Sequence, residues 1–201
     1  MIKAVPVMVL ATSNVGKARE LAHFLEDTPV KVTMLRNAGA KLEGSEGECD
    51  YEQNAIAKAR RAAQAEGKTA LGEDSGLEVE CLGGKPGPMS ARYVSADATA
   101  TQKNEALLGE LEKTPDEGRA AKFVSLVAIA EPSGAVKTFR GECCGRIAVE
   151  ERGNCGFGYD PVFIPDGHEK TLGELGLEVK NKLSHRAMAM AKARAYLEAN
   201  C

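Results

Sequence analysis

The chain has 201 residues, of which 43% are hydrophobic, enough to bury a full core as one domain or as two tightly joined lobes. Its formal net charge of -3 argues against a dedicated nucleic-acid binder, because such proteins carry a basic excess. The six cysteines form no CxxC pair and no Cys/His metal spacing, so neither a structural zinc nor a disulfide framework is expected. This cysteine usage fits a reducing cytoplasm.

The N-terminal apolar run has the charge and apolarity of a signal peptide but not its full pattern. Pro6 interrupts the run, and the polar residues 12–14 follow at once without a cleavage pattern. No stretch of the sequence is long enough to span a bilayer. We therefore expect a soluble, cytoplasmic protein that engages neither membrane nor nucleic acid.

A strand, a polar turn and a helix are expected in succession at the start of the chain. Residues 5–11 are apolar throughout and mostly β-branched or aliphatic, as in a strand buried on both faces. The turn at 12–17 follows, and apolar residues then recur at helical spacing over 18–25. Such a turn at a helix N-terminus binds anions, and Lys17 adds a charge, although a lysine there is usually just solvated. A second strand at 30–35 makes the unit β-α-β.

The next segment is expected to be a loop followed by a helix. Residues 39–49 are rich in glycine and acids, which is typical of an exposed flexible loop. The helix begins after Asp50, which forms a capping box with Gln53, and Gly67 ends it. This helix returns the chain to the sheet at 69–72.

Two adjacent acids, Glu73 and Asp74, stand where we expect that strand to end. Ligands bind at the carboxyl ends of strands in open α/β sheets, and charge there must be solvated, paired or bound to metal. An acidic turn after a strand is the plainer alternative. Successive side chains of a strand point to opposite faces, so both acids should not enter one site, and Asp74 is the better candidate.

The second half of the chain changes character. Residues 81–93 alternate Gly and Pro and predict an irregular loop, either the wall of a site or a simple chain reversal. An amphipathic helix is expected at 101–113. Strands at 123–130, 136–142 and 145–149 read as an antiparallel meander, so the whole sheet should be mixed.

An aromatic–glycine cluster occupies residues 156–161. Its glycines permit close backbone approach, and the rings of Phe157 and Tyr159 can stack on a flat ligand or pack as an ordinary core turn.

The last element is a terminal helix at 187–199, with Ser184 as its N-cap. This places His185 and Arg186 in the first turn, where two cations oppose the helix dipole. A nearby anionic or electron-rich group explains that placement, and a solvent-facing pair is the alternative.

Four stretches occur in order along the chain: 12–17, 73–77 with 83–93, 157–161, and 180–186. In this combination the chain closely resembles the inosine triphosphate pyrophosphatase family, the HAM1-like non-standard purine NTP pyrophosphatases, over essentially its whole length. The resemblance implies an elongated two-lobed α/β fold around a long twisted mixed β-sheet flanked by helices. It also implies an active-site cleft between the lobes, a single domain over residues 1–201, and a homodimer.

The activity implied by the resemblance is Mg²⁺-dependent hydrolysis of ITP, dITP and XTP to the monophosphate and pyrophosphate, which cleanses the nucleotide pool. Asp74 would be metal ligand and proton acceptor, Glu46 the second metal-binding carboxylate, and Lys17 a catalytic cation. The implied triphosphate contacts are Thr12, Ser13, Asn14, Val15, Gly16, Lys17 and Ser75. The implied base and substrate contacts are Phe157, Gly158, Tyr159, Asp160, Lys180, His185 and Arg186.

Three positions depart from the family pattern. Ser13 stands where glycine is common, Glu73 replaces an aspartate often found before Asp74, and Gln53 replaces a more usual glutamate. None of these changes a residue that must act.

Selectivity for a 6-keto purine is expected from donors of Arg186 and the 184–185 turn, which would satisfy O6 and face the amino group of adenine unfavourably. A pyrophosphatase for other nucleotides, as in the Maf-like family, is one alternative, and the elements at 184–186 and 157–160 speak against it. A catalytically silent nucleotide-binding module is another, which the intact Glu46 and Asp74 disfavour.

Overall fold

The computed structural model describes residues 6–42 and 50–200. The chain divides into two units, each assembled from separate segments of sequence. Unit 1 comprises Met1–Asp74, Ser125–Gly141 and Arg186–Cys201, and unit 2 comprises Ser75–Val124 and Glu142–His185. Three long strands contribute residues to both units: β3 (Thr69–Val79), β5 (Ala120–Ala130) and β6 (Val136–Ile147).

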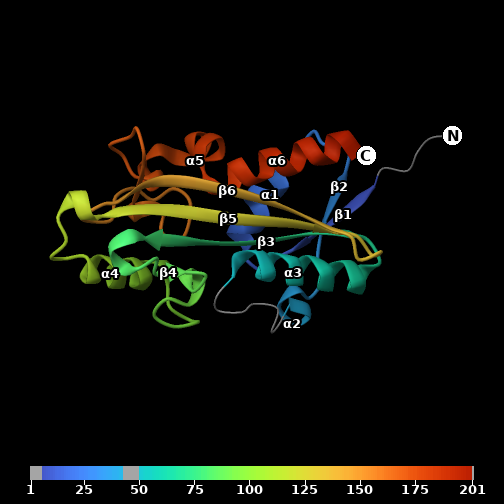
Figure 1. Cartoon of the computed structure of the whole chain (residues 1–201), viewed down its shortest axis with the longest axis horizontal. Coiled ribbons are helices and arrows are strands. Elements are labelled where there is room, and N and C mark those ends of the chain that lie inside the picture. The colour runs from blue at the N-terminus through green and yellow to red at the C-terminus, as the bar shows by residue number, and fades with distance from the viewer. Residues whose placement is uncertain (1–5, 43–49, 201) are drawn as a thin grey trace. The chain divides into compact units, whose positions relative to one another are not determined.

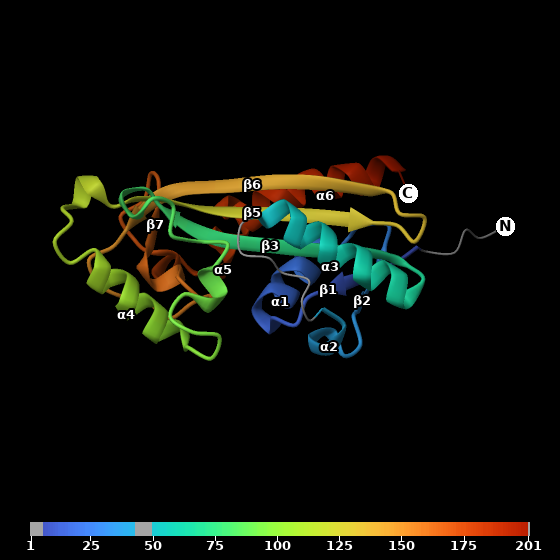
Figure 2. The same cartoon turned by 60° about the horizontal axis from the view of Figure 1, so that its bottom comes forward.

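The sheet is mixed and flanked by helices, as expected. The strand order is β2-β1-β3-β5-β6-β7, and β4 pairs with β3 outside this path. β1 is parallel to both β2 and β3, whereas β3–β4 and β6–β7 are antiparallel. In unit 1, α3 and α6 lie on opposite sides of the sheet (Figure 1 and Figure 2).

Unit 1 begins with the expected β-α-β unit, formed by β1 (Val7–Ala11), α1 (Val15–Phe24) and β2 (Lys31–Met34). Its core packs leucines and methionines of β1, α1 and β3 against β5 and α6. The loop expected at 39–49 is wrong for its first residues, since α2 spans Ala38–Leu42. Residues 43–49, with the predicted metal ligand Glu46, lie outside the described residues.

The helix α3 (Tyr51–Glu66) has the predicted ends. Asp50 accepts hydrogen bonds from the backbone N–H groups of Glu52 and Gln53, and Gly67 ends the helix in a left-handed conformation with φ of 61°. The helix packs directly on β3 at Gly72, where an added Cβ would stand 2.4 Å from a carbonyl oxygen of α3. Only a glycine permits this approach of helix to strand.

The acid pair does not end a strand, contrary to our expectation. β3 runs on through both acids to Val79, and Glu73 and Asp74 are only 1% and 6% exposed. The strand that ends here is the neighbouring β1, whose last residue Ala11 pairs with Gly72. The acids therefore lie just beyond the carboxyl end of β1, in the middle of β3.

Unit 2 contains β4 (Pro86–Gly87), α4 (Ala100–Glu110), β7 (Phe163–Pro165) and α5 (Leu172–Leu183), with short 3-10 turns at Glu80–Leu82, Ser90–Arg92, Asp116–Gly118 and Asp160–Val162. Its core gathers apolar side chains of β3, α4, β5, β6 and β7. The sequence did not indicate α5, which contains the non-helical Gly176 with φ of 79°.

Two further expectations need correction. The strands expected at 136–142 and 145–149 form one strand, β6, in which Cys143 is buried and Cys144 exposed as alternation requires. The terminal helix α6 (His185–Asn200) begins two residues before the expected bound. It follows directly on the extended Ser184, so the prediction that His185 and Arg186 lie in its first turn is confirmed. Within the described ranges, no helix has the length and apolarity needed to cross a membrane, and the four described cysteines are free thiols.

Candidate active site

The turn at 12–17 connects the carboxyl end of β1 to the N-terminus of α1. Asn14 caps α1 by accepting a hydrogen bond from the Lys17 backbone N–H at 3.0 Å, and the Asn14 N–H donates to Thr12 Oγ1 at 3.1 Å. The positive end of the helix dipole therefore faces the turn. A depression of about 350 Å³ adjoins it, lined by Thr12, Ser13, Asn14 and Val15 together with Ala18, Arg19, Ala22 and Met34.

Glu73 is an ionised carboxylate surrounded by cations. Arg186 lies 3.0 Å and 3.1 Å from Glu73 Oε1 through two nitrogens, and Ser125 Oγ donates to the same oxygen at 2.9 Å. Lys17 Nζ forms an ion pair with Oε2 at 3.0 Å. Burial by itself raises the pKa of Glu73, but Arg186 and then Lys17 and Lys58 outweigh it and hold that pKa well below its usual range.

Arg186 is 1% exposed and bridges two carboxylates. Besides Glu73 it reaches Glu20 of α1, with Nη1 at 2.5 Å from Oε2. Burial lowers the pKa of Arg186, whereas Glu73 and Glu20 raise it, and the net direction is upward. Lys17, Glu73, Arg186 and Glu20 thus form a buried cluster of two cations and two anions, in which both glutamates are bound to the guanidinium.

Asp74 makes its contacts on the other side of β3. Its Oδ2 accepts from Asn54 Nδ2 at 2.9 Å, and its Oδ1 accepts from Lys58 Nζ at 2.9 Å. Lys58 Nζ also donates to the Glu73 carbonyl oxygen at 3.1 Å. The prediction that the two acids face apart is confirmed, because Asp74 contacts α3 while the Glu73 side chain contacts α1 and α6.

The contacts of Asp74 are compatible with a magnesium ligand. Each carboxylate oxygen accepts a hydrogen bond from a side chain of α3. An ionised carboxylate offers about four lone-pair sites, so Asp74 retains capacity for a metal. Mg²⁺ is usually held by one or two carboxylates plus substrate phosphates, so a larger cluster is not required. The described part of the chain contains no group of three metal-ligating side chains, and Glu46 lies outside it.

In unit 2 the aromatic–glycine turn is organised by Asp160, which is 2% exposed. Asp160 Oδ2 accepts from the Phe157 N–H at 2.7 Å and from Lys180 Nζ at 2.5 Å. The Lys180 ammonium also lies 4.3 Å from the centroid of the Phe157 ring. These three predicted site residues are therefore brought together on the turn, although they are distant in sequence.

The other predicted residues of unit 2 have defined surroundings too. The Tyr159 hydroxyl donates to the Ser90 carbonyl oxygen at 3.0 Å, which ties the turn to the irregular loop. His185 is 3% exposed and stacks on Phe123, with ring centroids 4.6 Å apart and planes 12° from parallel. Tyr159 and His185 are thus packed side chains of unit 2, and Ser75 is a half-buried residue of β3.

Sequence reasoning missed several residues of these clusters. Asn54 and Lys58 stand four apart on the helix, which places them on one face, and this spacing was a usable signal. Glu20 and Ser125 gave no local signal, because an acid in a helix and a serine in a strand look unremarkable. Glu20 matters because it binds Arg186, and Ser125 matters because it donates to Glu73, and both partners lie far away along the chain.

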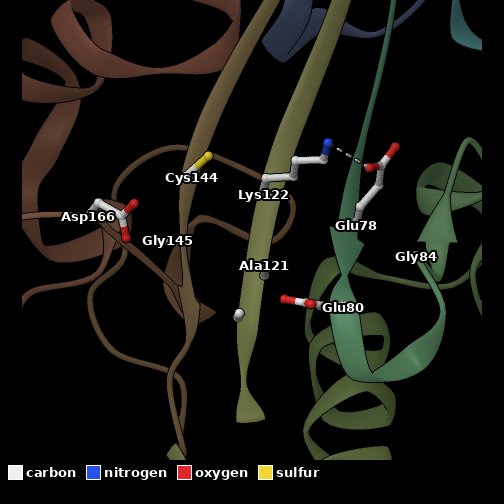
Figure 3. Close-up of a pocket in the computed structure, with 9 residues that line it drawn as sticks. Glu78, Glu80, Gly84, Ala121, Lys122, Cys144, Gly145 and Asp166 are labelled. Atoms are coloured by element: carbon white, nitrogen blue, oxygen red, sulfur yellow. Dashed lines mark ion pairs between the residues drawn. The ribbon is translucent and has the colours of Figure 1, made fainter. Parts of the chain in front are cut away.

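A second depression, of about 580 Å³, lies in unit 2 (Figure 3). Its lining includes Glu78, Glu80, Lys122 and Asp166. The Lys122 side chain points toward Glu78 and forms an ion pair with it at 3.5 Å (Figure 3). None of the predicted site residues within 6–42 and 50–200 lines this depression. Alternation along β3 puts Leu77 and Val79 into the core and Glu78 on the opposite face, so this depression lies on the outer face of the sheet.

The fold and these clusters define an α/β protein with buried, ion-paired carboxylates close to the N-terminus of α1. The chain belongs to the Ham1 family, whose model matches residues 8–196. It is 41% identical over 191 residues to the dITP/XTP pyrophosphatase of Bacillus subtilis, covering 95% of this chain and 96% of that protein. The corresponding enzyme of Desulfotalea psychrophila is also 41% identical, covering 95% of this chain and 85% of that protein.

Solved structures agree with this assignment. The HAM1 protein of Coxiella burnetii superposes with a TM-score of 0.83 at 35% identity, over 96% of this chain and 98% of that one.

Proposed function

We infer that this chain is a dITP/XTP pyrophosphatase, a hydrolase that splits a non-standard purine nucleoside triphosphate into monophosphate and pyrophosphate. The observation that carries the assignment is nearly full-length likeness, at 41% identity over 95% of the chain, to enzymes of that name. We propose that the substrates are ITP, dITP and XTP and that Mg²⁺ is the cofactor. Both units serve this one activity, as a single domain.

In the proposed mechanism Asp74 accepts the proton of the attacking water. Its carboxylate is fixed on both oxygens by Asn54 and Lys58, so it presents its remaining lone pairs in one orientation. Mg²⁺, when bound, would neutralise phosphate charge, with Asp74 and Glu46 as the protein ligands. The pyrophosphate then leaves as a group whose charge the chain's cations stabilise.

The triphosphate is assigned to the turn at 12–17 and to Ser75. Backbone groups at the α1 N-terminus face the anion, and Lys17 adds a positive charge close by. Lys17 is anchored on Glu73, with its side chain still 15% exposed. This pairing orients the ammonium at the turn without removing it from solvent.

The base is assigned to the turn at 157–160 with Lys180, His185 and Arg186. The Phe157 ring offers a stacking face. Lys180, held by Asp160, packs its ammonium against this ring and so helps to fix the position of the ring. Arg186 is balanced by two carboxylates, so it acts as an oriented hydrogen-bond donor rather than as a net charge. That property suits a neutral keto oxygen such as O6 better than it suits a phosphate.

We further propose that the enzyme is a cytoplasmic homodimer. The decisive experiment measures pyrophosphate and orthophosphate released from dITP, XTP, GTP, ATP and dUTP, with Mg²⁺ and with EDTA. The expected result is Mg²⁺-dependent pyrophosphate from dITP and XTP and little from ATP. Orthophosphate as the first product, or equal rates on ATP, would overturn the assignment.

A further inference from the structure

The turn at 157–160 is held from α4 as well as by its own residues. Asn104 of α4 donates from Nδ2 to the carbonyl oxygen of Gly158 at 3.2 Å and to Glu151 Oε1 at 2.5 Å. Asn104 is 1% exposed, whereas Glu151 is exposed and Gly158 is half-buried, so the amide reaches from the interior to the edge of the unit. One side-chain amide therefore joins two points of the segment that leads from β6 into the turn.

The bond to Gly158 bears on the position of the Phe157 ring. The Phe157 N–H is fixed by Asp160 at 2.7 Å, and the next residue, Gly158, is left-handed with φ of 65°. Glycine has the widest conformational freedom of any residue, so the peptide after it needs an external restraint to stay in one orientation. Asn104 supplies that restraint at the Gly158 carbonyl.

The amide of Asn104 is also incompletely satisfied. Its Oδ1 is buried and has no hydrogen-bond partner within residues 6–42 and 50–200. A buried acceptor without a partner destabilises the fold, and a leucine of similar volume would avoid that penalty. The presence of an amide is therefore explained by what its N–H groups hold.

We propose that Asn104 is a positioning residue for recognition of the purine base, acting through Gly158 on Phe157 and touching no substrate itself. This inference rests on the proposed function, in which the turn at 157–160 binds the base. The two reaction products distinguish an effect on base recognition from an effect on phosphate binding, because the monophosphate carries the base and pyrophosphate carries none.

The test compares the dissociation constants of deoxyinosine monophosphate and pyrophosphate by calorimetry in Asn104→Asp, which keeps the side-chain size and removes both donated bonds. The monophosphate is expected to bind about tenfold more weakly, the worth of one such hydrogen bond, with pyrophosphate affinity unchanged. Asn104→Ala introduces no charge beside Glu151 and is expected to behave alike. Equal weakening of both products, or of neither, overturns the proposal.

Two controls separate positioning from stability. Thr99→Ala breaks the capping box of the same helix by removing Thr99 Oγ1, which accepts from the Gln102 N–H at 3.2 Å. The second bond of the box, from the Thr99 N–H to Gln102 Oε1 at 2.8 Å, does not need the threonine side chain. Thr99→Ala is expected to lower Tm without weakening monophosphate binding. If it weakened monophosphate binding as much as Asn104→Asp does, the inference would be refuted.

The second control is the double variant Asn104→Asp with Glu151→Gln. It restores a hydrogen bond between the side chains at 104 and 151 but not the bond to Gly158.

In that double variant we expect Tm to recover while monophosphate binding stays weak. Recovery of both Tm and monophosphate affinity would show that Asn104 acts through Glu151 and not through Gly158, and would overturn the proposal. Failure of the proposed function looks different: the unaltered chain would then release no pyrophosphate from dITP.

Discussion

Replacing Lys58 with methionine tests how the buried carboxylate of Asp74 is held. The Lys58 and Asp74 side chains are 6% and 8% exposed, and their charged atoms stand 2.9 Å apart. Removing one partner of a buried ion pair costs about 3–5 kcal/mol, because the remaining charge is left uncompensated. Asn54 still donates to Asp74 in this variant. We therefore expect the free energy of unfolding to fall by about 3 kcal/mol, the lower end of that range.

The assay is urea unfolding followed by circular dichroism, with EDTA present so that no divalent cation replaces the ammonium. Lys137→Met is the control, since Lys137 is exposed and such surface changes stay within about 0.5 kcal/mol. The sharper comparison adds Asp74→Asn to the Lys58→Met chain. Because the buried negative charge is then gone, the second substitution should raise stability by about 1–3 kcal/mol.

The opposite result would be that Asp74→Asn lowers the free energy of unfolding by the same amount with Lys58 present and with Lys58 replaced by methionine. That result would mean that the two side chains do not interact energetically, whatever their separation. It would also remove the structural basis for treating α3 as the support of the proposed proton acceptor.

Three further outcomes are expected. Asp74→Asn should lower the rate of pyrophosphate release by about 100-fold or more, the usual contribution of a general base. The rate is measured well below Tm, because Tm also falls when the buried Lys58 loses its charged partner. Gly145→Ala should lower the free energy of unfolding by about 1–3 kcal/mol, because the added Cβ would lie 2.2 Å from a β7 carbonyl oxygen, whereas Gly109→Ala meets nothing within 4 Å. Burial raises the pKa of Cys143 to about 12, so its thiol stays protonated at pH 8. Iodoacetamide should therefore label the exposed Cys144 and leave Cys143 unlabelled. Equal labelling of both cysteines in the folded protein would contradict this.

Local signals predicted the elements that depend on local chemistry. The β-α-β start followed from an aliphatic run, a polar turn and a helical repeat, and α3 followed from its Asp50 cap and its Gly67 terminus. These features act within a few residues, so the sequence displays them directly. The mixed sheet was predictable for the same reason, because a helix joins parallel strands and short turns join antiparallel ones.

The errors arise where distant residues override local preference. Glu73 sits inside a strand because Arg186, 113 residues away, neutralises it, and no local pattern shows such a partner. β6 continues through Cys143 and Cys144 because each side chain suits its own face, a fact that depends on what covers each face. α5 escaped notice because its two glycines weaken the helical pattern that its Thr171 capping box supports.

The adjacent acids illustrate how one strand separates two kinds of chemistry. Because β3 alternates its side chains, consecutive carboxylates face different helices and acquire different partners. Glu73 is bound by two cations and holds Arg186 in place, so its charge is already used within the protein. Asp74 meets one ammonium and one amide, which leaves it acceptor capacity for a water or a metal. A strand that ended at these acids would expose both to solvent, and neither would then have a fixed orientation. The continuation of β3 to Val79 is therefore what gives the two acids separate roles.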